Sequence, residues 1–203
     1  MAAWTDVALS KEEVHQRKRE AVVAKAAQEF RKRGYHATSM DHVASALGVT
    51  KGALYRYVKS KDEVLFECFM QSNRLADMSL ARVEQMDADG ATKLQGFLRY
   101  FIHAYLDSNL AGGAMIEIDA LTARQRKLVV EGRDRVEAAL RRIIRGGQKD
   151  RSLGSDDPKM MIFTFMGAIN WIPSWYKPSG SLSTEEIAET VSRLLVDGLR
   201  NRG

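Results

Sequence analysis

The chain has 203 residues, of which 45% are apolar and 28% are charged, and this globular composition excludes an intrinsically disordered protein. Residues 1–62 carry twelve Lys and Arg against seven Asp and Glu, which accounts for the whole net charge of +5 and leaves residues 63–203 neutral. Such asymmetry favours a polyanion-binding first domain over a chance imbalance on a solvated surface.

Helix signals open the chain, beginning with residues 11–33. Their apolar residues trace one stripe, and Gly34 follows at the position where a helix commonly ends. A short helix is predicted next over 40–47, with Ser39 as its N-cap. We therefore expect two consecutive helices in the basic part of the chain.

A glycine bend separates the second helix from a third. Gly48 suits the left-handed conformation of a tight turn, and Thr50 can cap a helix over 51–58. A small residue, Ala44, lies where the next helix would cross. Four apolar residues are placed to fill the space between the two helices: Val43, Leu47, Val49 and Leu54. This pattern is that of a helix-turn-helix.

The neutral remainder also reads as helices. Ser60 and Glu63 have the spacing of a capping box that opens a helix running toward Met86. Three helices are then expected near residues 92–107, 110–119 and 122–147, the last stopped by Gly146-Gly147.

The last two predicted helices are more apolar than the others. Residues 158–172 are apolar on nearly all faces, and Pro173 is expected to break the chain. Ser183 and Glu186 form a second capping box, which opens a final helix with an apolar stripe. The sequence thus predicts an all-α protein: a three-helix helix-turn-helix domain over 1–60 and a helical effector-binding and dimerisation domain over 61–203.

The first domain resembles a known family. The segments GYHATSMDHVA (residues 34–44) and TKGALYRYVKSKDE (residues 50–63) resemble the N-terminal domain of TetR-type transcriptional regulators in order and spacing. Two places depart from the usual pattern: Ala53 stands where threonine is frequent, and Tyr57-Val58 where a His-Phe pair is common. The resemblance implies a sequence-specific, ligand-released repressor that binds a palindromic double-stranded DNA operator.

A third helix that enters the major groove tip-first would bring its first residues nearest the base edges. Lys51 can then donate to guanine, Gly52 permits close approach, and Tyr55 and Tyr57 would place hydroxyl groups on flanking phosphates. Thr38, Ser39 and Lys61 resemble phosphate contacts of the family. The expected DNA-binding residues are Thr38, Ser39, Thr50, Lys51, Gly52, Ala53, Tyr55, Arg56, Tyr57 and Lys61. For each of them the alternative is a solvated surface side chain.

The second domain carries aromatic and methionine residues at helical spacing. Individually these residues are more often packing than ligand contacts, but together they can line an apolar cavity for a small effector. The expected effector-binding residues are Phe97, Phe101, Tyr105, Met115, Phe165, Met166, Asn170 and Trp171. The family resemblance also implies a homodimer through the last two helices; the alternative is a monomer in which both helices are core.

A narrower resemblance concerns the effector. Residues 170–180, NWIPSWYKPSG, resemble a signature of TetR-type regulators of lipid, steroid and acyl-CoA catabolism. We therefore expect an acyl-CoA or another hydrophobic small molecule. A free lipophile, an aromatic drug-like compound, no physiological ligand and a purely structural role for the signature are the alternatives.

Other classes of function receive little support from the sequence. Cys68 has no base near it in sequence, and the four histidines lack metal-ligand spacing, so we expect neither an enzyme nor a metal or cofactor site. The longest apolar stretch falls short of the roughly 18 residues of a membrane span, and no signal peptide is evident, which predicts a cytoplasmic protein. A nonspecific architectural DNA-binding protein remains the competing interpretation.

Overall fold

The computed structural model describes residues 10–108 and 118–201. Over these residues the chain forms helices and no strand, with one isolated antiparallel bridge between Leu153 and Arg200, so the predicted all-α fold is confirmed. None of the described helices is long and apolar enough to cross a membrane. The helices are α1 (Lys11–Arg33), α2 (Met40–Leu47), α3 (Lys51–Leu54), α4 (Lys61–Glu84), α5 (Gly90–Asp107), α6 (Ala123–Lys149), α7 (Pro158–Trp175) and α8 (Thr184–Leu199), with a 3-10 turn, η1 (Ile118–Ala120), before α6.

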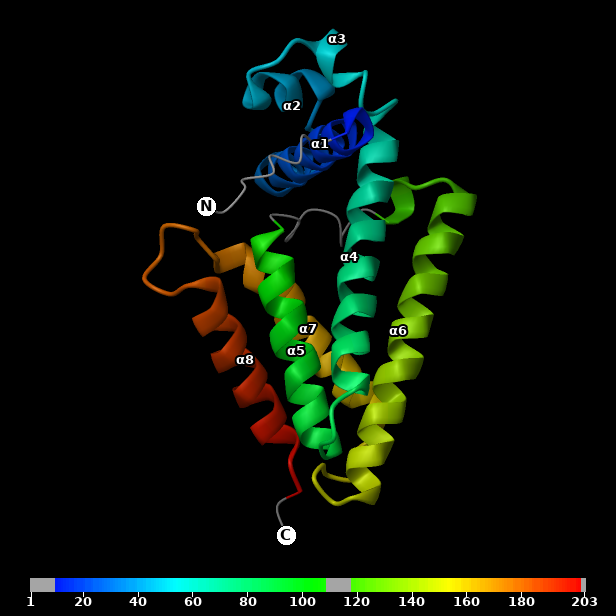
Figure 1. The fold of residues 1–203 in the computed structure, drawn as a ribbon, viewed down its shortest axis with the longest axis vertical. Coiled ribbons are helices and arrows are strands. Elements are labelled where there is room, and N and C mark those ends of the chain that lie inside the picture. Colours follow the sequence, from blue (N-terminus) through cyan, green and yellow to red (C-terminus); the bar gives the residue numbers. More distant parts are fainter. Residues whose placement is uncertain (1–9, 109–117, 202–203) are drawn as a thin grey trace, which may run out of the picture.

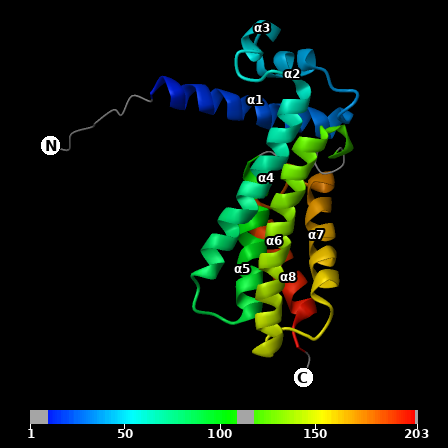
Figure 2. The ribbon, with the colours of Figure 1, turned by 90° about the vertical axis from the view of Figure 1, so that its right-hand side faces the viewer.

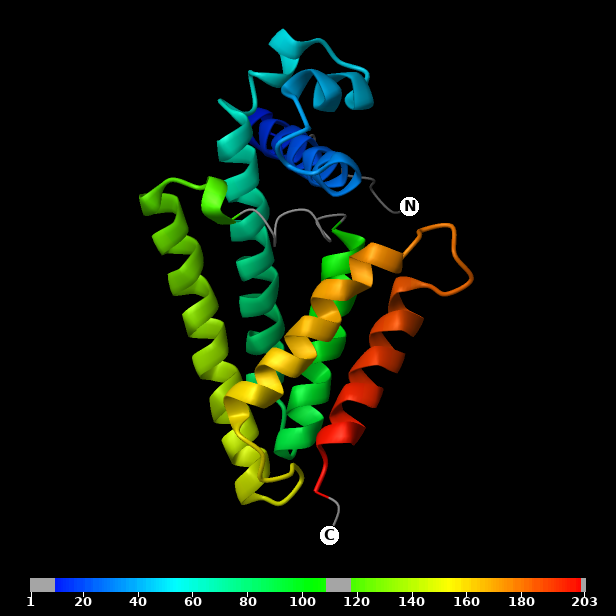
Figure 3. The ribbon, with the colours of Figure 1, turned by 180° about the vertical axis from the view of Figure 1, so that it is seen from behind.

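Helices α1, α2 and α3 form a head at one end of the molecule, and α5 to α8 form a body at the other (Figure 1). Helix α1 lies crosswise to the long axis of the body (Figure 2). In the body, α5 packs against α4, α6 and α8, and α7 crosses one face obliquely with α8 beside it (Figure 3). Helix α4 runs from the head into the body and joins the two.

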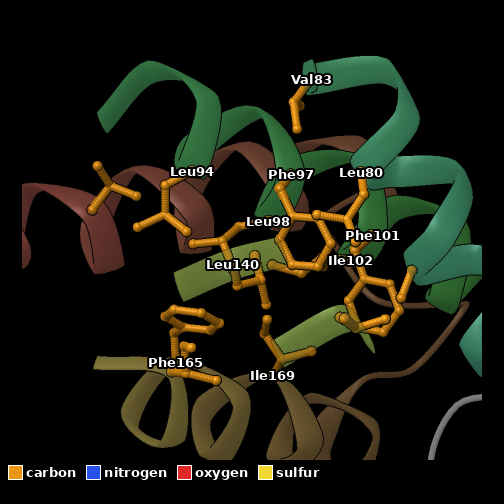
Figure 4. Close-up of a cluster of buried hydrophobic side chains, with 14 of the residues drawn as sticks. Leu80, Val83, Leu94, Phe97, Leu98, Phe101, Ile102, Leu140, Phe165 and Ile169 are labelled. Carbon is orange, nitrogen blue, oxygen red and sulfur yellow. The ribbon is translucent and has the colours of Figure 1, made fainter. Parts of the chain in front are cut away.

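The chain has two buried apolar clusters. The body cluster includes the stacked rings of Phe97 and Phe101, with Phe165 facing them from α7 (Figure 4). The head cluster joins α1, α2 and α3 to the first turns of α4 and the start of α6. Leu75 of α4 packs against both clusters. Helix α4 begins at Lys61, directly after the boundary that the sequence predicts between residues 60 and 61, and its residues contribute to both clusters.

Most of the predicted helix starts have the expected caps. The hydroxyl groups of Ser39, Thr50 and Ser183 each accept an N–H of the first turn, and Ser183 and Glu186 complete a capping box. Ser60 accepts the Glu63 N–H at 3.1 Å, but the Glu63 carboxylate accepts from the Lys59 N–H instead of closing the box on Ser60. Local hydrogen bonding by Ser and Thr thus defines these starts.

Helix α3 ends at Leu54 and is shorter than predicted, because its last hydrogen bond of the α-helical type runs from the Tyr55 N–H to the Lys51 carbonyl, at 3.1 Å. The Arg56 and Tyr57 amides donate to carbonyls three residues back, at 3.4 and 3.0 Å, which gives a turn over 55–57. Val49 was expected to fill the space between α2 and α3, and this is wrong: the side chain is 43% exposed. It lies in the bend after Gly48, whose φ of 66° and ψ of 30° are left-handed.

Two predicted helix ends are wrong. Helix α6 continues through Gly146-Gly147 to Lys149, since Gly147 serves close packing: a Cβ there would lie 2.7 Å from Leu153 Cδ1. Helix α7 continues through Pro173 to Trp175, because a proline in the last turn removes only one helical hydrogen bond. The helix predicted over 110–119 falls largely on residues 109–117, outside the described residues.

Candidate functional site

The outer end of the head is the tip of α3 (Figure 1). Thr50 begins the helix by accepting the Ala53 N–H at 3.2 Å, and Leu54, only 1% exposed, anchors it in the head cluster. Lys51 and Gly52 are exposed and Ala53 is half-buried. The local structure therefore presents Thr50, Lys51 and Gly52 outward on a short, firmly anchored helix.

Lys51 forms an ion pair with Asp41, a residue that no sequence motif indicates. Its Nζ lies 2.7 Å from Asp41 Oδ2, and both side chains are exposed. The hydrogen bond from Lys51 to the Asp41 carboxylate raises the pKa of this lysine, which stays a cation. No short-range sequence pattern pairs these residues, because they lie ten positions apart on two helices that the bend at Gly48 separates.

Two tyrosines flank Arg56 at the end of α3. Tyr55 and Arg56 are exposed. The Tyr57 ring is half-buried against the head cluster, with its centroid 5.0 Å from that of the His15 ring. Tyr55 and Arg56 therefore face solvent beside the tip, whereas Tyr57 combines packing with a partly exposed surface.

The start of α2 leaves one of two expected contact residues accessible and buries the other. Ser39 is partly exposed, and its amide donates to Nδ1 of His42 at 3.2 Å. Thr38 is 2% exposed, and its hydroxyl donates to the carbonyls of Glu29 and Gly34 at 3.1 and 2.8 Å. The expected phosphate contact of Thr38 is thus wrong, because its side chain ties the end of α1 to α2.

Lys61 begins α4 beside the head. Its Nζ lies 4.1 Å from the centroid of the Tyr35 ring and 3.4 Å from the carbonyl oxygen of His36. The side chain is half-buried, so it is positioned by the ring face rather than extended freely into solvent.

The head is also tied to α4 by charge. Arg19 of α1 reaches Glu63 at 2.9 Å and Glu67 at 3.1 Å, and these hydrogen bonds raise the pKa of Arg19. Burial opposes ionisation of Glu63, but the Lys59 amide and Arg19 outweigh it and lower the pKa of this carboxyl. This half-buried network fixes α1 on the upper part of α4.

A mostly apolar cavity of about 210 Å³ lies between α4, α5, α6 and α7. Three of the expected effector-binding residues line it: Phe101, Met166 and Asn170. The complete lining is Ser72, Asn73, Ala76, Phe101, Arg133, Val136, Glu137, Leu140, Ile162, Phe163, Met166 and Asn170. The residues from α4 and α6 were missed, because nothing in their helical patterns separates a cavity wall from ordinary packing.

The other expected effector residues lie elsewhere. Phe97 and Phe165 are fully buried in the body cluster, and Tyr105 stacks on Phe101 with centroids 5.6 Å apart. Trp171 is 68% exposed and outside the lining, so its expected place in this cavity is wrong. Met115 lies outside the described residues.

Helices α4 and α6 come very close beside the cavity. The Nδ2 of Asn73 donates to the Val129 carbonyl at 3.2 Å, and a Cβ on Gly132 would lie 2.1 Å from that nitrogen. In the next position, the Arg133 guanidinium lies 5.3 Å from the centroid of the Phe69 ring, which belongs to the head cluster. The cavity wall is thus in direct contact with the base of the head.

Helices α7 and α8 carry an exposed apolar face on the described chain. Trp171, Trp175 and Phe163 of α7 are 68%, 47% and 51% exposed, and Leu194 of α8 is 59% exposed. Two adjacent helices with such large uncovered side chains are typical of a protein interface.

Cys68 has no exposed reactive surface. It is 1% exposed, and burial raises the pKa of its thiol to about 12, so the thiol is protonated at neutral pH and packs as a small apolar group. Among the residues that the structure describes, no group of three or more His, Cys, Asp or Glu can hold a metal ion.

Two protein-family models match the chain. The model of bacterial regulatory proteins of the tetR family matches residues 22–68, which span the second half of α1 through the first turns of α4. The model of the tetracyclin repressor-like C-terminal domain matches residues 87–199, which is more than half of the chain.

Individual proteins agree with these matches. The HTH-type transcriptional repressor KstR2 of Rhodococcus jostii (strain RHA1) is 24% identical over 176 residues, which cover 84% of this chain and 85% of that protein. The structure of PfmR from Thermus thermophilus is 27% identical, with a TM-score of 0.75, and the match covers 88% and 98% of the two chains. AibR, solved in complex with isovaleryl coenzyme A and operator DNA, is 24% identical, with a TM-score of 0.70 and coverage of 90% and 97%.

Proposed function

Because the chain belongs to the TetR family of transcriptional regulators, we propose that it is a repressor that binds a palindromic operator as a homodimer and leaves it when an effector binds. The observation that carries this proposal is the exposed, anchored tip of α3 at the outer end of a basic head. A tip of this kind enters the major groove of DNA, where base edges are distinguishable.

The proposed DNA-binding surface has a division of roles. Lys51 reads base edges beside Thr50, Gly52 and Ala53, and phosphate contacts come from the flanking residues. The proposed phosphate contacts are Ser39, Tyr55, Arg56, Tyr57 and Lys61. Their exposure or partial exposure supports these roles, since base contacts specify the sequence and phosphate contacts position the protein.

The proposed dimer forms through α7 and α8. A second copy would cover Trp171, Trp175 and Leu194, which are large apolar side chains that a lone chain leaves in water. A two-fold dimer presents two heads to the two halves of a palindrome.

The proposed effector site is the cavity between α4 and α7, in a protein that acts in the cytoplasm. The mostly apolar wall supports a hydrophobic ligand, and Phe101, Met166 and Asn170 are the expected residues that line it. The likeness to AibR, which was solved with isovaleryl coenzyme A, supports an acyl-CoA. The name of KstR2, a transcriptional repressor, supports repression as the sign of regulation.

Footprinting tests the proposed function. Binding sites selected from fragments of the source genome are expected to show a short protected palindrome with one dimer bound. The competing architectural protein would give diffuse protection that spreads with concentration, and that result would reject the proposed repressor.

Replacing Lys51 or Lys61 by alanine is expected to change DNA binding in two different ways. Lys51→Ala should flatten the preference for operator over random DNA, because the base contact is lost. Lys61→Ala should weaken binding to all sequences alike and reduce the slope of log K against log salt by about one. Titrations at several salt concentrations measure both effects. Equal, sequence-independent losses from both variants would refute the division of roles.

Asp41→Asn is expected to strengthen operator binding about two- to five-fold, the range of an exposed ion pair. The substitution removes the carboxylate that holds Lys51 at 2.7 Å and that also repels phosphates. The gain should shrink as salt rises, because exposed charges are screened. Fluorescence anisotropy at low and high salt measures it. Weaker binding by this variant would mean that Asp41 orients Lys51 for the base contact.

A further inference from the structure

The head has a mostly apolar cavity of its own, with a volume of about 310 Å³. It lies between α1, the end of α2, and α3 with the turn after it, at the outer end of the molecule (Figure 1). None of its lining residues belongs to the cavity between α4 and α7. The lining consists of Lys18, Ala21, Val22, Leu47, Val49, Ala53, Leu54, Arg56 and Tyr57.

Local packing explains why space is left in the head. Val22 and Leu54, 4% and 1% exposed, belong to the head cluster and close the cavity on its inner side. Ala21 of α1 and Ala53 of α3 contribute only methyl groups to the wall. Val49, which is 43% exposed, borders the cavity from the bend between α2 and α3. A ligand at this place would remove apolar surface from water, which favours binding.

Both charged groups of this lining are cations. Lys18 of α1 and Arg56 after α3 are exposed, and no Asp or Glu lines the cavity. Within residues 10–108 and 118–201, neither cation forms an ion pair. An anionic group at the mouth of the cavity would therefore meet two positive charges that no carboxylate of the described chain neutralises.

Two planar groups also line the cavity. The Tyr57 ring is half-buried, and the Arg56 guanidinium stands beside it in the sequence. Aromatic rings pack favourably on phenol rings and on guanidinium planes. The lining therefore suits an aromatic ligand better than a flexible chain.

The volume sets the size of such a ligand. A water molecule occupies about 30 Å³ in the liquid, so about 310 Å³ holds about ten heavy atoms. This volume lies at the lower end of the roughly 300–1,000 Å³ of sites for small molecules. Two fused aromatic rings, with ten carbons, match it and leave an acid group at the mouth.

We propose that the head cavity binds a small aromatic acid, with its rings between α1 and α3 and its anionic group at Lys18 and Arg56, and that this ligand and operator DNA exclude each other. The site itself goes beyond the proposed function, and the exclusion rests on it. A DNA phosphate is the other anion that could meet these cations, but a phosphate gains nothing from the apolar wall.

Shared residues are the reason for the exclusion. Ala53, Arg56 and Tyr57 line the cavity and also belong to the proposed DNA-binding surface. A bound acid occupies Arg56 and adds negative charge where phosphates would approach. Any such loss of operator affinity is matched by an equal loss of affinity for the acid when DNA is bound.

Calorimetric titration of the full-length protein with 2-naphthoate and its neutral amide, 2-naphthamide, tests the site. The acid is expected to bind about five-fold more tightly, since hydrogen bonds between charged groups are lost in the amide. Lys18→Met should reduce this preference to about two-fold. Lys11→Met is the matched control, because Lys11 is exposed two turns earlier on α1 and does not line the cavity.

Val49→Trp shows where the probe binds. An indole in place of the exposed Val49 side chain fills part of the cavity, and it should weaken binding of both probes by about ten-fold or more. Anisotropy with labelled operator then tests the exclusion. At ten times its dissociation constant, 2-naphthoate should raise the apparent dissociation constant for operator by about ten-fold in the unmodified protein, and it should have little effect in Val49→Trp.

Three results would overturn the site: no binding of 2-naphthoate, equal binding of the two probes, or unchanged binding in Val49→Trp, which would place the probe in the body. Failure of 2-naphthoate to bind, together with a salt slope for operator lowered by about one in Lys18→Met, would assign the cation to DNA instead. Constant operator affinity with bound 2-naphthoate would overturn the exclusion. Probe binding is measured without DNA and footprinting without probe, so the site and the proposed repressor can fail separately.

Discussion

Replacing Leu194 by glutamate is expected to convert the proposed homodimer into a monomer and to weaken operator binding by about 100-fold or more. Leu194 is 59% exposed on α8, and Trp171 of the neighbouring α7 is 68% exposed. In a two-fold dimer each such residue meets the partner's copy of the same face, so the variant buries two carboxylates without counter-ions. A lone head then binds one half-site without the gain from a linked second head.

Leu128→Glu is the matched control for Leu194→Glu. Leu128 is another exposed leucine, 42% accessible, but it lies on α6, away from the α7–α8 face. Light scattering after size-exclusion chromatography gives the mass, and anisotropy with labelled operator gives the affinity. If the Leu194→Glu protein stays dimeric, or if the Leu128→Glu protein dissociates equally, the dimer interface does not lie on α7 and α8.

Gly90→Ala is expected to destabilise the fold by about 2–3 kcal/mol, the usual cost of overpacking. A Cβ on Gly90 would lie 2.3 Å from the Cα of Gly147, so main-chain atoms of α5 and α6 must separate. The same residue donates its N–H to Asp150 at 2.9 Å, and separation of the helices strains this bond as well. For a chain of this length the melting temperature should fall by about 5–10 °C.

Gly146→Ala provides the control for this effect within the same helix contact region. A Cβ on Gly146 meets nothing within 4 Å, and alanine favours a helix interior by about 1 kcal/mol over glycine. This variant is therefore expected to melt at a slightly higher temperature than the unmodified protein. Differential scanning calorimetry compares the two, and a Gly90→Ala protein as stable as Gly146→Ala would show that the two helices separate without cost.

The helices of the head could be predicted from the sequence, because the residues that define their ends act within a few positions along the chain. Ser39 and Thr50 cap the helices that follow them, Gly48 adopts the left-handed turn, and Leu54 is buried. Each of these outcomes depends on hydrogen bonds or packing within a few residues. Thr38 was not predicted correctly. Its hydroxyl donates to the carbonyls of Glu29 and Gly34, and no short-range sequence pattern shows that these bonds bury the side chain.

The helix ends and the cavity of the body were harder to predict from the sequence, because they depend on residues that are distant along the chain. Gly147 is typical of a helix end, yet it lies within α6 because Gly90 and Leu153 pack on it. Trp171 was expected in the cavity but is 68% exposed on α7 and does not line it. A helix that is apolar all round gives no indication of which side faces a cavity and which faces a partner.

Helix α4 has 24 residues, which corresponds to a rod about 36 Å long at 1.5 Å per residue. Its upper turns are fastened to α1 by Arg19, and its middle forms part of the cavity wall through Asn73. A rod of this length acts as a lever: a tilt of about 5° at the lower end carries the upper end through about 3 Å. That displacement is close to the roughly 3.4 Å step between base pairs. A tilt of α4 by a few degrees would therefore be enough to move the two heads of a dimer out of register with the major groove.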